Sequence, residues 1–304
     1  MKSDFVWMDG SLVPWEQANV HFLTPTLHYG PGVFEGIRCY ETPDGPAVFR
    51  LQDHMQRFLE SIHILGVLEM PFTHSQLCQA VKETIQANQL RSCYIRPLMF
   101  LQGPMGLNMD RSKPSVGIAA WEWGPYLGQE ALEKGANMMI SSYTRLHPNI
   151  AMTKAKISGN YVNSMLVKTL ALRSGYDEAA IVDPQGYVAE CTGENIFLVR
   201  NGVVYTPPLG NILEGITRDS IITLAQDLGY EVREMLITRD FLYIADEAFI
   251  TGTAAEVVPI RAMDTRVIGE GAMGPVTRAL QTAFYENAHG QGKFSKIWLD
   301  PVED

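Results

Sequence analysis

The sequence has 304 residues, of which 46% are hydrophobic and 19% are charged, and its formal net charge is −10. Such a chain is long enough for two domains or one large α/β unit, and its balance of apolar and charged residues excludes a disordered protein. An acidic chain without a basic block is also a poor candidate for binding nucleic acid or an anionic membrane, so a few local cations and backbone dipoles must hold any anionic ligand.

The cysteines and the first residues bear on the cellular compartment. No C-x-x-C pair occurs among the cysteines, so we expect neither a metal site nor a disulfide framework, and the thiols are typical of a reduced, cytoplasmic protein. The N-terminus lacks the apolar core of a signal peptide, and no stretch approaches the ~18 apolar residues that a membrane span needs. The cysteines are Cys39, Cys78, Cys93 and Cys191.

The first part of the chain mixes strand and helix patterns and predicts a small α/β domain over residues 1–122. Asp9-Gly10 is a strong hairpin signal, and Gly66 follows a run of apolar residues at helical spacing. We expect strands over 5–8, 33–40, 93–101 and 115–121, and helices over 51–65 and about 74–90.

Gly and Pro punctuate the segment 123–132, which we expect to be an interdomain linker. Residues 133–304 are then the larger domain, with an irregular stretch over 144–155 that leads to Lys156. Strands are expected near 137–143, 179–182, 187–190, 196–199, 203–206 and 248–250, and helices over 158–174, from Gly215 to Gly229 and from Gly274 to about Ala288.

Two turns of small residues in the second half could bind a phosphate. Gly215-Ile216-Thr217 and Thr251-Gly252-Thr253 each offer clustered backbone N–H groups beside a hydroxyl. Neither matches a phosphate-binding loop followed by lysine, nor the G-x-G-x-x-G pattern. An ordinary helix cap and a plain turn therefore remain open alternatives for these two segments.

Lys156 is the strongest candidate for covalent chemistry. A lysine that forms a Schiff base must be partly desolvated and must have small neighbours, and here Ala155 precedes it while Ser158-Gly159 follows. Tyr161 lies about one helical turn further on. On spacing alone a solvated loop lysine is the more common interpretation, and Lys154 is a nearby competitor.

The order of several motifs identifies a family. In chain order they are His28-Tyr29-Gly30, Phe34-Glu35-Gly36-Ile37-Arg38, His54-Met55-Gln56-Arg57, Tyr94-Ile95-Arg96-Pro97, Lys156 to Tyr161, Glu190 through Gly193-Glu194-Asn195, Gly215-Ile216-Thr217-Arg218 and Thr251 to Glu256. From Trp7 to Asp300 the chain resembles a branched-chain amino acid aminotransferase of fold type IV, which depends on pyridoxal 5′-phosphate (PLP). The resemblance implies an α/β (α+β) fold with a small N-terminal domain and a larger, barrel-like C-terminal domain flanked by helices.

The resemblance implies a role for each cofactor residue. Lys156 would form the Schiff base with PLP and carry the proton between the substrate Cα and C4′ of the cofactor. Tyr161 would hydrogen-bond the phenolic oxygen, and Glu190 would pair with the pyridine nitrogen. Arg57, Ile216, Thr217 and Thr253 would hold the phosphate.

The resemblance also implies substrate residues. Tyr94, Thr253 and Ala254 would bind the α-carboxylate, Arg96 with Tyr29 and Tyr126 would bind the side-chain carboxylate of glutamate, and Phe34 would line an apolar pocket. The activity would be reversible ping-pong transfer of the amino group between L-leucine, L-isoleucine or L-valine and 2-oxoglutarate, giving branched-chain 2-oxo acids and L-glutamate, as the last step of branched-chain amino acid biosynthesis. A homodimer would be the minimal unit, because the loop around Met105-Gly106-Leu107 reaches a neighbouring site, and hexamers also occur in the family.

Two classes of alternative remain. A D-amino acid or (R)-amine transaminase, or the lyase that makes 4-aminobenzoate, could use the same scaffold. The D-amino acid enzymes of this fold are expected to carry an Arg-x-His pattern where this chain has Tyr94-Ile95-Arg96, which argues against them. A cofactor-free binding protein is the second alternative. The presence of Lys156, Glu190 and Arg57 argues against it.

Overall fold

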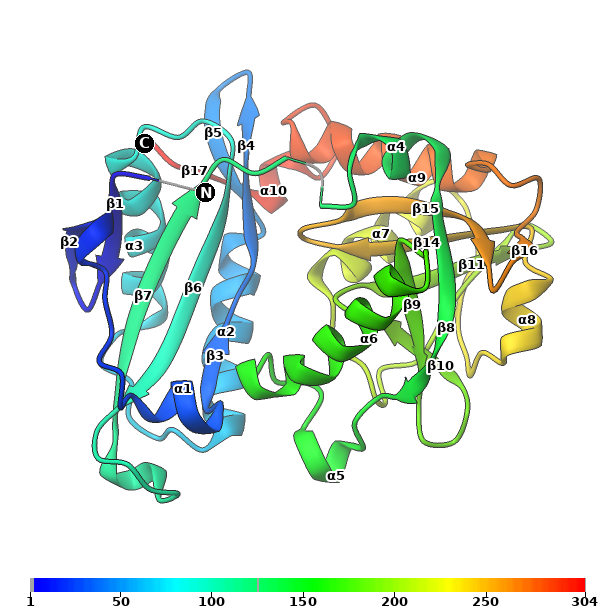
Figure 1. The fold of residues 1–304 in the computed structure, drawn as a ribbon. Coiled ribbons are helices and arrows are strands. Elements are labelled where there is room, and N and C mark those ends of the chain that lie inside the picture. Colours follow the sequence, from blue (N-terminus) through cyan, green and yellow to red (C-terminus); the bar gives the residue numbers. More distant parts are fainter. Residues whose placement is uncertain (1–2, 125, 304) are drawn as a thin grey trace. The chain divides into compact units, whose positions relative to one another are not determined.

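A computed structural model describes residues 3–124 and 126–303, so Pro125 in the expected linker lies outside the described residues. The chain divides into two compact units (Figure 1). Unit 1 comprises Met1–Trp123, Ala155–Asn160 and Asn287–Asp304, and unit 2 comprises Gly124–Lys154 and Tyr161–Glu286. Unit 2 therefore includes residues 124–132 of the expected linker, and it lacks two segments of the expected domain over 133–304, namely 155–160 and 287–304. Their backbones pair within unit 1, where Ile157 bridges Val33 and strand β17 (Leu299–Pro301) joins β5 (Gly45–Phe49).

Unit 1 is built on an antiparallel sheet that contains the expected hairpin. Asp9 and Gly10 both have positive φ, 46° and 99°, as a two-residue hairpin turn requires. The strand order is β17–β5–β4–β6–β7–β1–β2, with β3 also paired to β6. The other bounds are β1 (Phe5–Met8), β2 (Ser11–Pro14), β3 (Gly32–Phe34), β4 (Ile37–Thr42), β6 (Cys93–Gln102) and β7 (Lys113–Trp121).

The strand expected over 33–40 is interrupted at Glu35-Gly36, which separates β3 from β4. A Cβ atom on Gly36 would lie 2.0 Å from the Tyr94 hydroxyl oxygen, so only glycine allows the backbone to approach this closely. The Glu35 N–H donates to the Pro97 carbonyl at 3.0 Å, which fixes the break against β6. As a result the Glu35 side chain is fully buried in unit 1.

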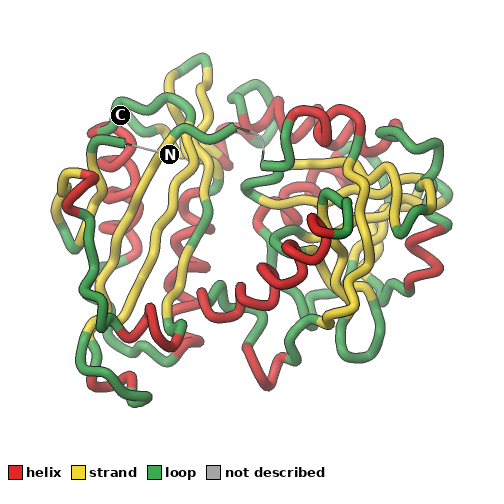
Figure 2. The backbone as a smooth tube through the Cα atoms, in the orientation of Figure 1, coloured by secondary structure: helices red, strands yellow, loops and turns green. Residues whose placement is uncertain are grey.

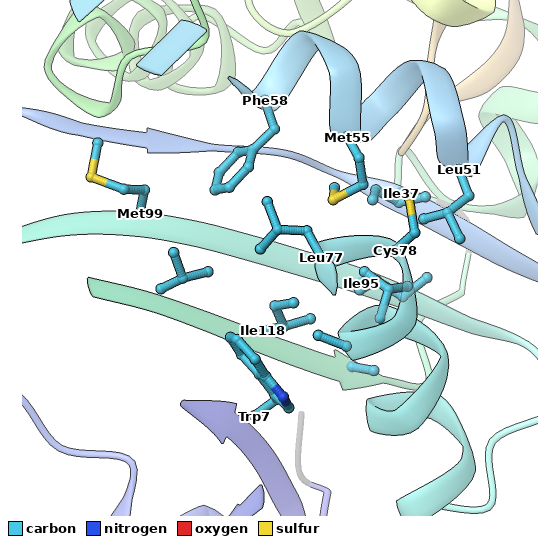
Figure 3. Packing of buried hydrophobic residues seen from close by; sticks show 14 of the residues in the cluster. Trp7, Ile37, Leu51, Met55, Phe58, Leu77, Cys78, Ile95, Met99 and Ile118 are labelled. Carbon is cyan, nitrogen blue, oxygen red and sulfur yellow. The ribbon is translucent and has the colours of Figure 1, made fainter. Parts of the chain in front are cut away.

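Two helices supply the apolar partner of this sheet. Helix α2 (Leu51–Leu65) ends at Gly66 with φ 95°, and α3 (His74–Ala87) begins with a capping box between Thr73 and Gln76. Figure 3 shows their apolar side chains meeting those of the strands in one core. Unit 1 also contains η1 (Trp15–Gln17), α1 (Pro25–Tyr29), η2 (Met109–Arg111), η3 (Ser158–Asn160) and α10 (Ser295–Trp298).

Unit 2 contains a strongly curved sheet, in agreement with the barrel-like domain that the resemblance implies. The edge strand β10 is bridged at Val188 to Ile237, just beyond the opposite edge strand β13, and the Val188 N–H donates to the Ile237 carbonyl at 2.8 Å. The order is β10 (Val188–Cys191), β9 (Glu178–Val182), β8 (Ala136–Thr144), β15 (Glu256–Met263), β14 (Glu247–Gly252), β11 (Asn195–Arg200), β12 (Val203–Thr206) and β13 (Val232–Glu234), with β16 (Arg266–Val267) beside β15.

Helices flank the sheet of unit 2, and Figure 2 shows them in red around the yellow strands. Buried Glu247 fixes the start of α9, because its carboxylate accepts the N–H groups of Val276 and Thr277 at 3.0 and 2.7 Å. The helices are α4 (Gln129–Lys134), α5 (Pro148–Ala151), α6 (Tyr161–Arg173), α7 (Ile216–Asp227), α8 (Arg239–Tyr243) and α9 (Pro275–Ala288). Across residues 3–124 and 126–303, none of the helices is long and apolar enough to cross a membrane.

Candidate active site

Lys156 lies in unit 1 with its backbone held on both sides. Its N–H donates to the Ser61 Oγ of α2 at 3.0 Å, and its carbonyl accepts the Phe34 N–H at 3.1 Å. Its Nζ lies 5.1 Å from the centroid of the Phe34 ring. The amine is thus half-buried against an aromatic surface, and the short segment that carries it has little freedom to move.

Three of the expected substrate residues gather beside Lys156. The Arg96 guanidinium carbon lies 4.7 Å from the Phe34 ring centroid and 5.4 Å from that of Tyr94. Arg96 also donates from Nη2 to the Tyr94 hydroxyl at 3.1 Å. Its buried Nε has no hydrogen-bond partner among the described residues, and an incoming carboxylate would supply one.

Arg57 projects from α2 onto a buried carboxylate of unit 1. Its Nε and Nη2 donate to the two oxygens of Glu35 at 2.7 and 2.8 Å, and His54 Nδ1 lies 2.8 Å from Glu35 Oε2. Burial by itself would raise the pKa of Glu35. The Arg57 charge and the His54 hydrogen bond outweigh burial and hold that pKa well below its usual range.

Glu190 is the buried carboxylate of unit 2 and is 5% exposed. Its Oε1 lies 2.6 Å from the Nε of Arg145, and its Oε2 accepts the Leu213 N–H at 3.1 Å. The paired guanidinium gives this buried carboxylate a counter-charge. Leu213 precedes the start of α7, so Glu190 and the expected phosphate residues Ile216 and Thr217 lie near one loop of the same unit.

The start of α7 is built as the sequence indicated. Gly215 is its N-cap and no side chain caps the helix, while Ile216 and Thr217 are buried at its first turn. A Cβ on Gly215 would lie 1.9 Å from Asn195 Oδ1, so glycine is required there. Backbone N–H groups at such a start suit a phosphate. Thr253 and Ala254 are half-buried in the turn between β14 and β15.

The expected tyrosines differ in their surroundings. Tyr161 is the first residue of α6, and the Tyr126 ring lies 5.3 Å from Lys168 Nζ, both within unit 2. Tyr29 is exposed on α1 and lines a cavity of about 170 Å³ with Gly106 and Leu107. Lys156, Arg57, Phe34, Tyr94, Arg96 and Tyr29 thus belong to unit 1, and the remaining expected residues belong to unit 2.

An additional cluster of buried charges lies in unit 2, where sequence reasoning assigned no role. Lys168 Nζ lies 2.7 Å from Glu178 Oε2, and Glu194 Oε2 accepts the Gly193 N–H at 3.0 Å. Burial, reinforced by the nearby Glu178 charge, raises the pKa of Glu194 to about 8. Arg145, Glu35 and His54 were also missed. Glu35, His54 and Glu194 stand inside the quoted motifs, which was the available signal.

No group of three or more His, Cys, Asp or Glu side chains suited to a metal ion occurs within the part of the chain that the structure describes. The cations and carboxylates found there are instead suited to a phosphorylated organic cofactor. Unit 1 has a half-buried amine and an anchored arginine, and unit 2 has a paired buried carboxylate and an open helix start.

Comparison with known proteins assigns this combination of fold and side chains to a class. The model of the amino-transferase class IV family matches residues 32–263. This span contains every residue expected to bind the cofactor, including Lys156 and Glu190. The chain therefore belongs to the class IV aminotransferase family.

The relatives narrow the family further. The branched-chain-amino-acid aminotransferase of Pseudomonas aeruginosa is 50% identical over 299 residues, which cover 98% of this chain and 97% of the relative. The crystal structure of the Escherichia coli enzyme of that name has a TM-score of 0.96 at 46% identity, covering 99% and 100% of the two chains. The structure of the Thermoproteus uzoniensis enzyme, solved with norvaline, has a TM-score of 0.94 at 43% identity and covers 99% and 100%. Within class IV, the chain belongs with the branched-chain-amino-acid aminotransferases, which confirms the resemblance seen in the sequence.

The raised pKa of Glu194 predicts a pH-dependent stability difference. Between pH 4.5, the ordinary carboxyl value, and about 8, the folded state holds a proton that the unfolded state has released, so stability falls as pH rises. Glu194→Gln should remove this effect, so its free energy of unfolding should rise relative to that of wild type by about 3–4 kcal/mol between pH 5 and 8. Urea denaturation at several pH values measures the difference. Glu270→Gln, on the exposed surface of the same unit, should show no such trend. An unchanged difference for Glu194→Gln between pH 5 and 8 would contradict the prediction.

Proposed function

We propose that the protein uses PLP to transfer the amino group reversibly between L-leucine, L-isoleucine or L-valine and 2-oxoglutarate. The observation that carries this proposal is Lys156, a half-buried amine with a fixed backbone beside Phe34 and Arg96. The relationship to branched-chain-amino-acid aminotransferases supports the same reaction, including a 47% identical relative solved in complex with N-(5′-phosphopyridoxyl)-L-glutamate.

When bound, PLP supplies an electron sink for the pair of electrons left on the substrate Cα. Lys156 holds the cofactor covalently between turnovers, and its Nζ then moves the proton between the substrate Cα and C4′ of the cofactor. The Phe34 ring, 5.1 Å from Nζ, shields one side of this amine from water. Such shielding keeps the proton transfer between the two carbon atoms.

Glu190 keeps the proton on the pyridine nitrogen. Its contacts with Arg145 and the Leu213 N–H hold the carboxylate in one orientation inside the unit. Tyr161 donates a hydrogen bond to the phenolic oxygen of the cofactor. Glu190 and Tyr161 would therefore hold the ring through two separate atoms, its nitrogen and its phenolic oxygen.

The phosphate is bound by one cation and by uncharged donors. Arg57 supplies the positive charge, while the backbone and hydroxyl groups of Ile216, Thr217 and Thr253 supply hydrogen bonds at the start of α7 and the β14–β15 turn. Thr217 is 4% exposed, so its hydroxyl is already shielded from bulk water. This arrangement suits an anion in a protein whose net charge is −10.

The substrate is recognised at two ends. Tyr94, the Thr253 hydroxyl and the Thr253-Ala254 backbone bind the α-carboxylate. Arg96 binds the side-chain carboxylate of glutamate, with Tyr29 and Tyr126 completing that part of the pocket, and Phe34 contacts an aliphatic side chain. Arg96 keeps the Tyr94 hydroxyl and two aromatic rings as neighbours when no carboxylate is present, so a leucine side chain does not strand a bare cation.

Replacing Lys156 tests the catalytic assignment. Lys156→Ala should abolish transamination of L-leucine with 2-oxoglutarate, because neither covalent anchoring nor proton transfer remains, while the protein still folds and binds PLP noncovalently. Activity assays and the visible absorption of the lysine-bound cofactor, before and after borohydride, measure the loss. The matched control is Lys154→Ala, since Lys154 is exposed and paired with Glu214. Near-normal turnover by Lys156→Ala would show that the wrong lysine was chosen.

A substrate panel tests the activity itself. With 2-oxoglutarate as acceptor, kcat/KM for L-leucine should exceed the values for D-alanine and (R)-1-phenylethylamine, because the chain is related to branched-chain-amino-acid aminotransferases and carries the Tyr94-Ile95-Arg96 motif. Initial rates at a fixed 2-oxoglutarate concentration provide the comparison. Faster turnover of D-alanine would favour the D-amino acid transaminase alternative and reject this proposal.

The proposed active form is at least a homodimer. One face of the unit 1 sheet carries an apolar groove of about 480 Å³, lined by Val6, Leu98 and Phe100 among others, and Leu27 on its rim is 61% exposed. A second copy would bury this surface and bring the Met105–Leu107 loop to the neighbouring site. A cytoplasmic location belongs to the same proposal, supported by four buried free thiols.

Analytical ultracentrifugation should therefore give a mass of two chains or an even multiple, such as the hexamer. Leu27→Asp should shift the population toward single chains, because a charge would enter the buried surface. Leu68→Asp, at a position 82% exposed and outside the groove, is the matched control. A single-chain mass for the wild-type protein at micromolar concentration would contradict the dimer.

A further inference from the structure

The buried Glu35 carboxylate accepts hydrogen bonds from four donors on its two oxygens. Oε1 accepts from Arg57 Nε at 2.7 Å, and Oε2 accepts from Arg57 Nη2, His54 Nδ1 and the Gly36 N–H at 2.8, 2.8 and 3.2 Å. Each carboxylate oxygen has two lone pairs, so the three donors at Oε2 leave that oxygen no open acceptor position, while Oε1 is held by the second bond of the Arg57 fork. The side chain is fully buried, and neither rotation nor solvent can replace a lost donor.

The charges of Glu35, His54 and Arg57 sum to zero without a ligand. Burial lowers the pKa of His54 despite the neighbouring Glu35, so its imidazole is neutral at pH 7 and donates its Nδ1 hydrogen. Glu35 is ionised and Arg57 is positive. Arg57 therefore lies in a pre-formed, neutral arrangement, with the Nε–Nη2 side of its planar fork committed to Glu35.

A guanidinium that donates to one carboxylate from its Nε–Nη2 edge can donate to a second anion only from its other N–H groups. The Glu35 carboxylate thus sets the plane and direction in which Arg57 approaches a phosphate. The backbone of Lys156 depends on the same helix, because Ser61 accepts its N–H one turn beyond Arg57. His54, Arg57 and Ser61 share one face of α2, so the orientation of Arg57 is tied to the segment that carries the reactive amine.

We propose that Glu35, supported by His54, is a positioning residue that pre-orients Arg57 for the cofactor phosphate. The inference rests on the proposed phosphate role of Arg57 and extends it to residues that never touch the cofactor. Its consequence is specific: Glu35 contributes to the affinity for the phosphate group and leaves the affinity for the pyridine ring unaffected.

Charge balance alone predicts the opposite change in phosphate affinity. Replacing Glu35 by an uncharged residue leaves Arg57 with an uncompensated positive charge, which by itself would strengthen phosphate binding. Loss of orientation would weaken it. Glu35→Gln keeps the size of the side chain but places an amide NH₂ against N–H donors, so Arg57 must turn away. The direction of the change in affinity therefore separates the two effects.

The experiment is titration of the apoprotein with PLP and with pyridoxal, which lacks the phosphate, followed by absorbance and fluorescence. For Glu35→Gln we expect the PLP dissociation constant to rise about tenfold or more, with the pyridoxal dissociation constant unchanged within about twofold. Asp53→Asn is the matched control, because it removes an exposed carboxylate that pairs with Arg50 on the same helix and should alter neither constant. His54→Ala removes one donor to Glu35 and should give a smaller, PLP-specific loss, which provides a second variant if Glu35→Gln does not fold.

Each other outcome has a defined meaning. Tighter PLP binding by Glu35→Gln, or equal weakening for PLP and pyridoxal, overturns the positioning role. Arg57→Gln provides the reference, and the double variant with Glu35→Gln should lose no more phosphate-dependent affinity than Arg57→Gln alone. A PLP-to-pyridoxal ratio unchanged by Arg57→Gln would remove the phosphate role of Arg57, and the inference with it. The proposed transaminase activity is tested separately, by the L-leucine assay on the wild-type protein.

Discussion

The peptide of Lys156 is the point on which the candidate site depends. A lysine amine sits at the end of four rotatable bonds, so its position is only as certain as that of its backbone. Here Phe34 at the end of β3 and Ser61 on α2 hold the two sides of that backbone. The same two elements carry the aromatic ring beside Nζ and the guanidinium of Arg57. One pair of hydrogen bonds therefore sets the amine relative to an apolar wall and a cation within unit 1.

Local signals predicted much of the fold because short-range physics produced them. The hairpin at Asp9-Gly10 and the helix from Leu51 to Gly66 have the expected bounds, since positive φ and apolar spacing leave their mark directly in the sequence. The break between β3 and β4 was missed. A glycine within a strand pattern looks continuous until its contact with Tyr94, which is distant in sequence, is known. The transfer of 155–160 and 287–304 to unit 1 likewise depends on long-range strand pairing.

The candidate site divides in the same way. Motif order identified the family and thereby named residues that are expected to contact the cofactor, and their individual roles stay predictions. The charged partners of these residues could not be predicted from the sequence, because each acts through an ion pair. Glu35 pairs with Arg57, and Arg145 pairs with Glu190. Each pair joins residues more than twenty positions apart, and either partner alone looks like an ordinary surface charge. Only burial and distance distinguish such residues from solvated ones.

The close approach of Gly36 to Tyr94 couples a position that shapes the backbone to a position whose side chain contacts Arg96. Any side chain at residue 36 would push against the Tyr94 hydroxyl, the same atom to which Arg96 donates. Enlarging residue 36 is therefore compatible with the fold only when residue 94 becomes smaller, and that exchange dismantles the support of Arg96. Variation at these positions must occur together. A library designed to reshape the pocket should encode residues 36, 94 and 96 as one unit, since changing them independently would sample mostly sequences that cannot pack.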